Sequence, residues 1–278
     1  MTNTPNQISF HDGHSIPQLG LGVWQASNEQ AALAVREALL NGYRNIDTAA
    51  IYGNEEGVAA GIKQSGVPRK DVFVTTKIWN DAQGASQSRA AFMQSLERLD
   101  TDYVDLLLIH WPLPMKDKYI ETWRTMIELQ QEGLVKSIGV SNFMELHLKR
   151  LIQETAIKPV LNQIELHPYM QQNVLRDAHQ QLGIRTEAWS PLAQNKALND
   201  AVIGQIAQKH GKTPTQIVIR WHLDNQVIVI PKSVTPSRIK QNFDVFDFEL
   251  DHDDMTLIAA LEKGQRLGPD PEVFSMGA

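Results

Sequence analysis

Four polar side chains in this chain have the types and spacing of a proton-transfer site: Asp47, Tyr52, Lys77 and His110. A free tyrosine has a pKa of about 10, which is too high for efficient proton transfer near neutral pH. An ammonium group about 4 Å away, at an effective dielectric constant of about 20, favours the phenolate by roughly 4 kcal/mol. Lys77 is therefore expected to activate Tyr52 as an acid. Asp47 would hold Lys77 charged and in place while cancelling part of its effect.

His110 completes the set, because an imidazole can donate a hydrogen bond to a carbonyl oxygen and orient it. Together these residue types suit the reduction of a carbonyl group. Each residue also has a purely structural interpretation: Asp47 and Lys77 as an ion pair, His110 as a core histidine, and Tyr52 as a packed loop aromatic. The combination of all of them at strand ends favours the catalytic interpretation.

The elements that would position these residues are eight short apolar or β-branched runs that alternate with amphipathic stretches. Several runs are almost continuously apolar, which indicates strands covered on both faces, as in parallel sheets. Eight strand–helix repeats predict a (β/α)8 TIM barrel, with an open α/β sheet as the alternative. The runs are Gly20–Val23, Arg44–Asp47, Val72–Thr76, Val104–Ile109, Ser137–Val140, Leu161–Glu165, Arg185–Trp189 and Val227–Ile230.

Residues that typically begin helices and turns support the predicted helices and the predicted closed end of the barrel. A helix is predicted over 28–41, with Asn28 as its cap, and Pro214 suits the first turn of another helix. Residues 8–16 predict a small N-terminal hairpin that plugs one end of the barrel. The active site would then lie at the opposite end, where the strands reach their carboxyl termini.

Composition excludes several classes of protein. The chain has no cysteine, which excludes disulfides, thiolate catalysis and cysteine-ligated zinc. A net charge of −6 gives no electrostatic case for nucleic acid or an anionic membrane, and no apolar run approaches the length of a membrane span. Motifs of zinc hydrolases, nucleophile elbows, Walker A loops and Rossmann sites are also missing. We expect a soluble cytoplasmic protein, with residues 1–278 forming a single barrel domain.

Motifs along almost the whole chain resemble the aldo-keto reductases, above all the bacterial 2,5-diketo-D-gluconate reductases, some of which also reduce methylglyoxal and β-keto esters. Their number and order make the resemblance specific. The matching segments are HDGHSIPQLGLGVW at 11–24, GYRNIDTAAIYGNEEGV at 42–58, TTKIWN at 75–80, LLLIHWPLP at 106–114, KSIGVSNF at 136–143, NQIELHP at 162–168, EAWSPLAQ at 187–194 and IPKSVTPSRIKQNFDVFDF at 230–248.

The resemblance implies that Asp47, Tyr52, Lys77 and His110 are the catalytic residues. NADPH would pass a hydride from nicotinamide C4 to the carbonyl carbon while Tyr52 protonates the oxygen. Trp189 matches the aromatic residue that stacks on the nicotinamide, a position where many eukaryotic members carry tyrosine. The other residues implied to bind the cofactor are Gly22, Val23, Trp24, Asp47, Ser141, Asn142, Gln163, Ser190, Pro191, Leu192, Gln194, Lys232, Ser233, Val234, Thr235, Arg238, Gln241 and Asn242.

Two groups among these have distinct expected roles. Ser141, Asn142 and Gln163 match residues that hold the nicotinamide carboxamide. The segment from Lys232 to Asn242 resembles an adenosine 2′-phosphate site, because Lys232 and Arg238 supply cationic donors and Pro236 begins a helix whose N-terminus favours an anion. NADP is therefore expected over NAD.

The substrate would be a small carbonyl compound in a pocket walled by Trp24, Tyr52, Trp79, His110 and Trp111. The short tail from Gly264 to Ala278 leaves the substrate itself open. Two other functions stay open. One is a Schiff-base enzyme with Lys77 or Lys232 as nucleophile, and the other is a regulatory module that binds NADPH with little turnover. We expect a monomer and no metal.

Overall fold

The computed structural model describes residues 6–277, and in that range eight parallel strands curl into a barrel in their order along the chain. Parallel bridges from Leu19 to Val229 and from Gly22 to Lys232 join the first strand to the last and close it. The predicted barrel is confirmed, and the open sheet is wrong. The strands are β3 (Leu21–Gly22), β4 (Asn45–Asp47), β5 (Phe73–Ile78), β6 (Val104–Ile109), β7 (Val135–Ser141), β8 (Leu161–Glu165), β9 (Arg185–Trp189) and β10 (Ile228–Val229).

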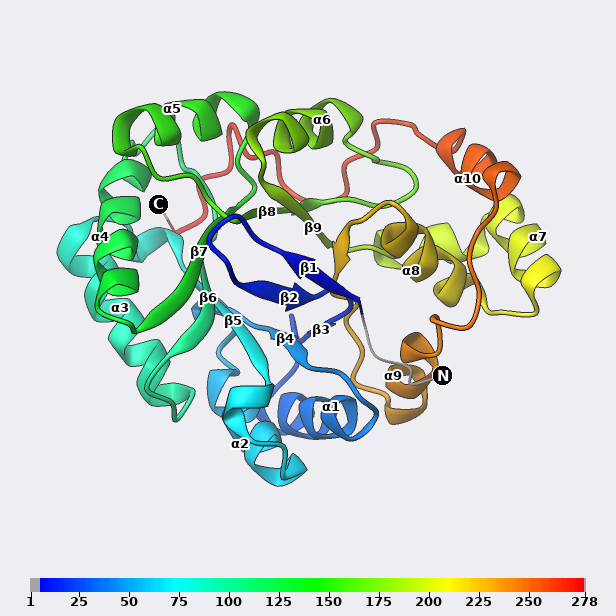
Figure 1. Ribbon diagram of the computed structural model, residues 1–278, viewed down its shortest axis with the longest axis horizontal. Helices are drawn as coiled ribbons and strands as arrows, with labels where there is room; N and C mark the ends of the chain where they lie inside the picture. Colours follow the sequence, from blue (N-terminus) through cyan, green and yellow to red (C-terminus); the bar gives the residue numbers. More distant parts are fainter. Residues whose placement is uncertain (1–5, 278) are drawn as a thin grey trace.

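Helices surround the strands and cover their outer faces (Figure 1). This arrangement explains the continuous apolar runs: every residue of β6 is buried, because one face meets helices and the other fills the barrel. The helices are α1 (Asn28–Leu40), α2 (Glu55–Ser65), α3 (Ala85–Arg98), α4 (Tyr119–Gln131), α5 (Glu145–Thr155), α6 (Asn173–Leu182), α7 (Ala201–His210), α8 (Pro214–Asp224), α9 (Pro236–Phe243) and α10 (His252–Ala259). Short 3-10 turns include η1 (Ala50–Tyr52) and η3 (Asn80–Ala82).

The cap of α1 differs from the prediction. Ser27, not Asn28, is the N-cap: its hydroxyl accepts from the Gln30 amide, and the Gln30 side chain accepts from the Ser27 amide. The Asn28 side chain instead accepts from the Gly57 amide at 2.7 Å and so ties α1 to α2. A tertiary contact therefore removed the capping role that Asn28 has by type. The predicted start of α8 at Pro214 is confirmed, with Thr213 as its cap.

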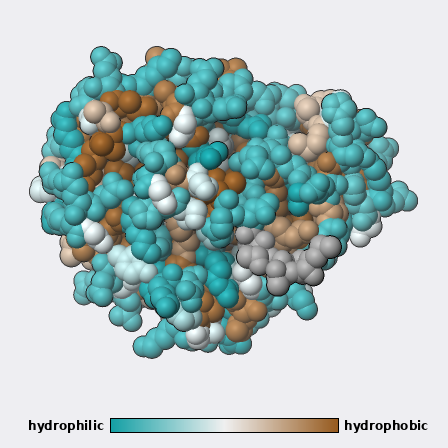
Figure 2. Space-filling model, viewed as in Figure 1, coloured by the Kyte–Doolittle hydropathy of each residue, from teal (hydrophilic) through white to brown (hydrophobic). Residues whose placement is uncertain are grey.

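The predicted hairpin is also present, as β1 (Gln7–Ser9) and β2 (Ser15–Pro17) in antiparallel register. It lies across the near end of the barrel in Figure 1, where Ile8, Phe10 and Ile16 pack against Leu106 and Leu108 inside the barrel. The same face is mostly hydrophilic in the space-filling view (Figure 2). The hairpin thus closes this end and leaves the carboxyl ends of the strands as the open one.

No helix among residues 6–277 is both long enough and apolar enough to cross a membrane. After α10, the chain returns over the open end of the barrel. The amides of Lys263 and Gln265 donate to the Tyr169 carbonyl, and those of Leu267 and Gly268 donate to the Glu165 carboxylate. The tail is therefore part of the open end rather than an appendage.

Candidate active site

A cavity of about 470 Å³ opens at the carboxyl ends of the strands. Most residues predicted for the site line it: Gly22, Trp24, Asp47, Tyr52, Trp79, His110, Trp111, Ser141, Asn142, Gln163, Trp189, Ser190, Pro191, Gln194 and Lys232. Val23 and Lys77 do not, because both side chains are buried. The lining residues that the sequence did not single out are Gln25, Ile51, Ile230, Gly268, Pro269, Phe274 and Met276.

Asp47, which lines this cavity, forms a buried ion pair with Lys77. The Lys77 ammonium donates to both carboxylate oxygens of Asp47, at 2.7 and 2.8 Å, and to the Thr48 carbonyl at 2.9 Å. Since an ammonium has three hydrogens, these bonds occupy all of its donors. Burial opposes a charged lysine, but Asp47 and Tyr52 outweigh it and raise the pKa of Lys77. Lys77 is therefore a fixed positive charge.

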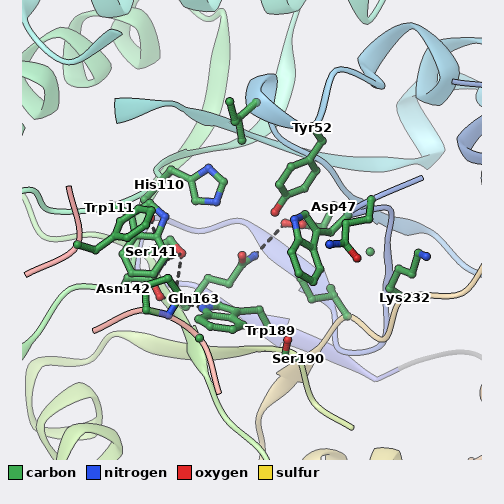
Figure 3. A pocket seen from close by; sticks show the side chains of 18 of the residues that line it. Asp47, Tyr52, His110, Trp111, Ser141, Asn142, Gln163, Trp189, Ser190 and Lys232 are labelled. Carbon is green, nitrogen blue, oxygen red and sulfur yellow. Dashed lines mark hydrogen bonds between the residues drawn. The ribbon is translucent and has the colours of Figure 1, made fainter. Parts of the chain in front are cut away.

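Tyr52 and His110 lie next to this charge and point into the same space (Figure 3). The Lys77 nitrogen is 5.3 Å from the centre of the Tyr52 ring, and the Tyr52 and His110 ring centres are 5.8 Å apart. Lys77 lowers the pKa of Tyr52 as expected, but burial outweighs it, and the net direction is upward. Burial, and next Lys77, hold the pKa of His110 well below its ordinary value. The site thus contains a protonated phenol beside a neutral imidazole.

Gln163 links Asp47 to a further buried carboxyl group, Glu187. The Gln163 amide nitrogen donates to Asp47 at 2.8 Å and to Glu187 at 2.9 Å. Both amide hydrogens are then used, so the free end of this side chain is a hydrogen-bond acceptor. Burial, followed by the charge of Asp47, raises the pKa of Glu187 to about 8. At neutral pH Glu187 is therefore a neutral carboxyl group beside the Asp47–Lys77 pair.

The sequence did not single out Glu187, although a signal was available. It lies two residues before Trp189 in β9, and side chains two apart in a strand point to the same face. Gln163 lies opposite it in β8. A charged residue in the middle of a buried strand, on the same face as predicted site residues, marks the inside of the barrel.

Ser141, Asn142 and Trp189 form a second hydrogen-bonded group in the cavity (Figure 3). The Ser141 hydroxyl donates to the Gln163 carbonyl at 2.9 Å, and the Asn142 amide donates to the His110 carbonyl at 3.0 Å. The Trp189 indole N–H donates to the Asn142 side-chain oxygen at 2.8 Å. These bonds fix the ring of Trp189 at one edge, with a broad aromatic surface in the cavity lining.

A second cavity, of about 450 Å³, adjoins the first, and Lys232 lines both. It contains the predicted phosphate-binding segment at the start of α9. Neither Lys232 nor Arg238 has an ion-pair partner among residues 6–277, so both are available to an anion. The lining is Leu192, Asn195, Leu198, Thr215, Lys232, Ser233, Val234, Thr235, Arg238, Gln241 and Asn242; Asn195, Leu198 and Thr215 were not predicted.

Comparison with known proteins agrees with this fold. The model of the aldo/keto reductase family matches residues 18–263. Methylglyoxal reductase DkgA of Escherichia coli K12 is 57% identical over 272 residues, which cover 97% of this chain and 98% of the enzyme. A crystal structure of an aldo/keto reductase from Brucella melitensis is 56% identical, with a TM-score of 0.91, and covers 93% of this chain and 100% of that one.

A mutant of the protein Gox0644, crystallised in complex with NADPH, is 49% identical to the chain, with a TM-score of 0.94. That match covers 98% of this chain and 99% of the other. Identity at this level over nearly the full length leaves no ambiguity about descent, and the order of the motifs agrees with it. The chain belongs to the aldo/keto reductase family.

Proposed function

We propose that this protein is an NADPH-dependent carbonyl reductase in which Tyr52 protonates the substrate oxygen. The observation that carries the proposal is a pair of adjoining cavities that share Lys232 in their linings. Tyr52, His110 and Asp47, which is paired with Lys77, line the first cavity, and Lys232 and Arg238 line the second. A reducing centre and a phosphate-binding cleft joined in this way suit a dinucleotide that carries a third phosphate.

The residues present fit this cofactor, which supplies the hydride when bound. Gln163 offers its free oxygen as an acceptor for a carboxamide N–H, and Ser141 and Asn142 lie beside it. Trp189 offers an aromatic face for a nicotinamide ring. Lys232, Ser233 and Arg238 would hold the 2′-phosphate near the N-terminus of α9.

Proton transfer follows from the charges around Tyr52. Its hydroxyl is protonated at neutral pH, as an acid in the reducing direction must be, and Lys77 offsets part of the rise in pKa that burial causes. As the proton moves to the carbonyl oxygen, negative charge develops on the phenol next to the fixed Lys77 ammonium, which stabilises it. Neutral His110 donates a hydrogen bond that orients the same oxygen. Asp47 keeps Lys77 charged and stationary.

The substrates we propose are small aldehydes, ketones and keto sugars: methylglyoxal first, and also 2,5-diketo-D-gluconate and β-keto esters. Methylglyoxal is the substrate in the name of the Escherichia coli relative. Trp24, Trp79 and Trp111 line the cavity and offer flat apolar surfaces against which the carbon skeleton of a small carbonyl compound can pack. We also propose that residues 1–278 act as a single barrel domain and as a monomer.

The Schiff-base alternative is weak for Lys77, whose donors are all engaged and whose pKa is raised, whereas a nucleophilic lysine needs a lowered pKa. The Schiff-base alternative stays open for Lys232, because Lys232 lines the cavity without a carboxylate partner in residues 6–277. Borohydride trapping with a carbonyl substrate tests it, because only a Schiff base leaves a covalent lysine adduct. Tight NADPH binding with no turnover would instead indicate a regulatory module.

The deciding experiment measures oxidation of NADPH, beside NADH, by the purified protein with methylglyoxal, 2,5-diketo-D-gluconate, ethyl acetoacetate and an aromatic aldehyde. We expect turnover that prefers NADPH with at least one of them. Folded protein that oxidises neither cofactor with any substrate would overturn the proposal.

A further inference from the structure

Glu165 ends strand β8 as a buried carboxylate that the proposed reaction does not use. One of its oxygens accepts from the Leu267 amide at 2.6 Å and lies 3.0 Å from the His167 ring nitrogen. The other oxygen accepts from the Gly268 amide at 3.0 Å. Burial alone would raise the pKa of Glu165, but these hydrogen bonds outweigh it and lower the pKa. Glu165 is therefore an ionised anchor for two consecutive amides of the tail.

Beyond this anchor, the tail forms one wall of the cavity. Gly268, Pro269, Phe274 and Met276 all line it. The Phe274 ring lies 4.3 Å from the Trp111 ring, centre to centre, and Asn80 donates to the Met276 carbonyl at 2.8 Å. The wall is thus held at two points, by Glu165 where it begins and by Asn80 where it ends. Only the first of these contacts involves a charge.

The anchored end of the tail also contacts Trp189. A methyl group added at Gly268 would come within 2.4 Å of the far edge of the Trp189 ring and 3.1 Å of the Glu165 carboxylate. The opposite edge of this ring donates to Asn142. The backbone at Gly268 therefore packs against the far edge of the Trp189 ring, and Glu165 holds that backbone in place.

We propose that Glu165 is a positioning residue that latches the C-terminal tail over the substrate side of the cavity and thereby sets which carbonyl compounds fit. The proposal rests on the proposed reductase function. Small substrates such as methylglyoxal need little of the tail wall, whereas an aromatic aldehyde reaches Phe274 and Trp111. Loss of the contact between Glu165 and the tail should therefore change the ratio of the activity on the aromatic aldehyde to the activity on methylglyoxal, and not only lower both activities.

The experiment compares the full-length wild type with Glu165→Gln and with the control Asp105→Asn. Asp105 is also a buried carboxylate that accepts from a backbone amide, that of Val74, but it lies in β6 near the hairpin. Two quantities are measured: hydrogen exchange of the tail amides, and kcat/KM with NADPH for methylglyoxal and for 4-nitrobenzaldehyde.

For Glu165→Gln we expect faster exchange at Leu267 and Gly268. We also expect kcat/KM for the aromatic aldehyde to fall on the order of tenfold relative to methylglyoxal, mainly through KM. Asp105→Asn should leave both quantities unchanged even where it lowers the Tm. Unchanged tail exchange and an unchanged substrate ratio in Glu165→Gln would overturn the latch.

A double-mutant cycle then tests the path of the effect. If Glu165 acts through the tail wall, Phe274→Ala should shift the same substrate ratio, and adding Glu165→Gln to it should have little further effect. Fully additive shifts would overturn this path. Should the wild type reduce no carbonyl at all, the reductase function fails, whereas the exchange measurement still decides whether Glu165 holds the tail.

Discussion

Each end of the barrel brings together an aspartate, a cation and a tyrosine, yet only one of these sets has the geometry of an active site. At the end closed by the hairpin, Asp105 pairs with Arg69 at 2.9 Å and with Lys136 at 2.8 Å, and both cations lie over the ring of Tyr103. At the open end, Asp47 pairs with Lys77 beside Tyr52. The residue types are the same, but their surroundings differ.

The difference lies in the balance of charge and in access to water. Two partly exposed cations serve Asp105, so water screens that set. At the open end a single buried cation faces two carboxyl groups, Asp47 and Glu187. A shortage of positive charge in a buried site shifts pKa values, whereas an excess near the surface only stabilises an ion pair. Chemistry is therefore expected where the charges are few, buried and next to a cavity.

The largest effect should come from the two tyrosines. Tyr52→Phe removes the proposed acid while keeping the ring, so we expect kcat to fall about a thousandfold with NADPH affinity nearly unchanged. Tyr103→Phe should leave kcat at the wild-type level. The check is steady-state kinetics beside NADPH titration. A Tyr52→Phe enzyme that keeps most of the wild-type kcat would contradict the assignment of Tyr52 as the proton donor.

The next contrast compares the cations. Lys77→Met leaves the Asp47 carboxylate buried without its partner, which should lower the free energy of unfolding by about 3–5 kcal/mol and abolish turnover. Lys136→Met leaves Asp105 paired with Arg69 near water, so the loss should stay below about 1 kcal/mol. Urea unfolding of both variants measures this, and equal losses would contradict the comparison.

Glu187 predicts a pH dependence at the open end of the barrel. Its folded pKa of about 8 lies above the ordinary value of 4.5, so the folded state holds this proton more tightly than the unfolded state. The contribution of Glu187 to stability is thus complete below pH 4.5 and is lost as the pH rises to about 8, by at most about 1.4 kcal/mol per pH unit.

Glu187→Gln should remove this component, so the wild type should lose more stability than the variant between pH 5 and pH 8. Urea unfolding across that range tests the prediction. Parallel stability curves for the two proteins would show that Glu187 does not titrate there.

The smallest effect concerns the second cavity, which Lys232 and Arg238 line. Arg238→Ala should raise the KM for NADPH about tenfold and leave the KM for NADH unchanged, because only NADPH carries the 2′-phosphate. Lys240→Ala is the matched control, since Lys240 is exposed on the same helix but does not line the cleft. An equal rise for both cofactors would place Arg238 elsewhere in the binding site.

The amino-acid sequence alone predicted the barrel from local patterns, and it predicted most residues of the site through its resemblance to the aldo-keto reductases. A strand buried on both faces must be apolar along its length, and each predicted run overlaps an observed strand. The carboxyl ends of those strands then meet in one place by the rules of the fold, which brought Asp47, Lys77 and His110 together without any knowledge of contacts.

What the tertiary structure decided depends on residues far apart in the chain. Gln163 reaches Asp47 across 116 positions, and Leu267 reaches Glu165 across 102. Burial in that setting raised the pKa of Tyr52 where the nearby lysine alone predicted a fall, and contact with α2 took Asn28 from its capping role. The spacing of residues along the chain predicts neither effect, because burial and long-range hydrogen bonds arise only when the whole barrel has closed.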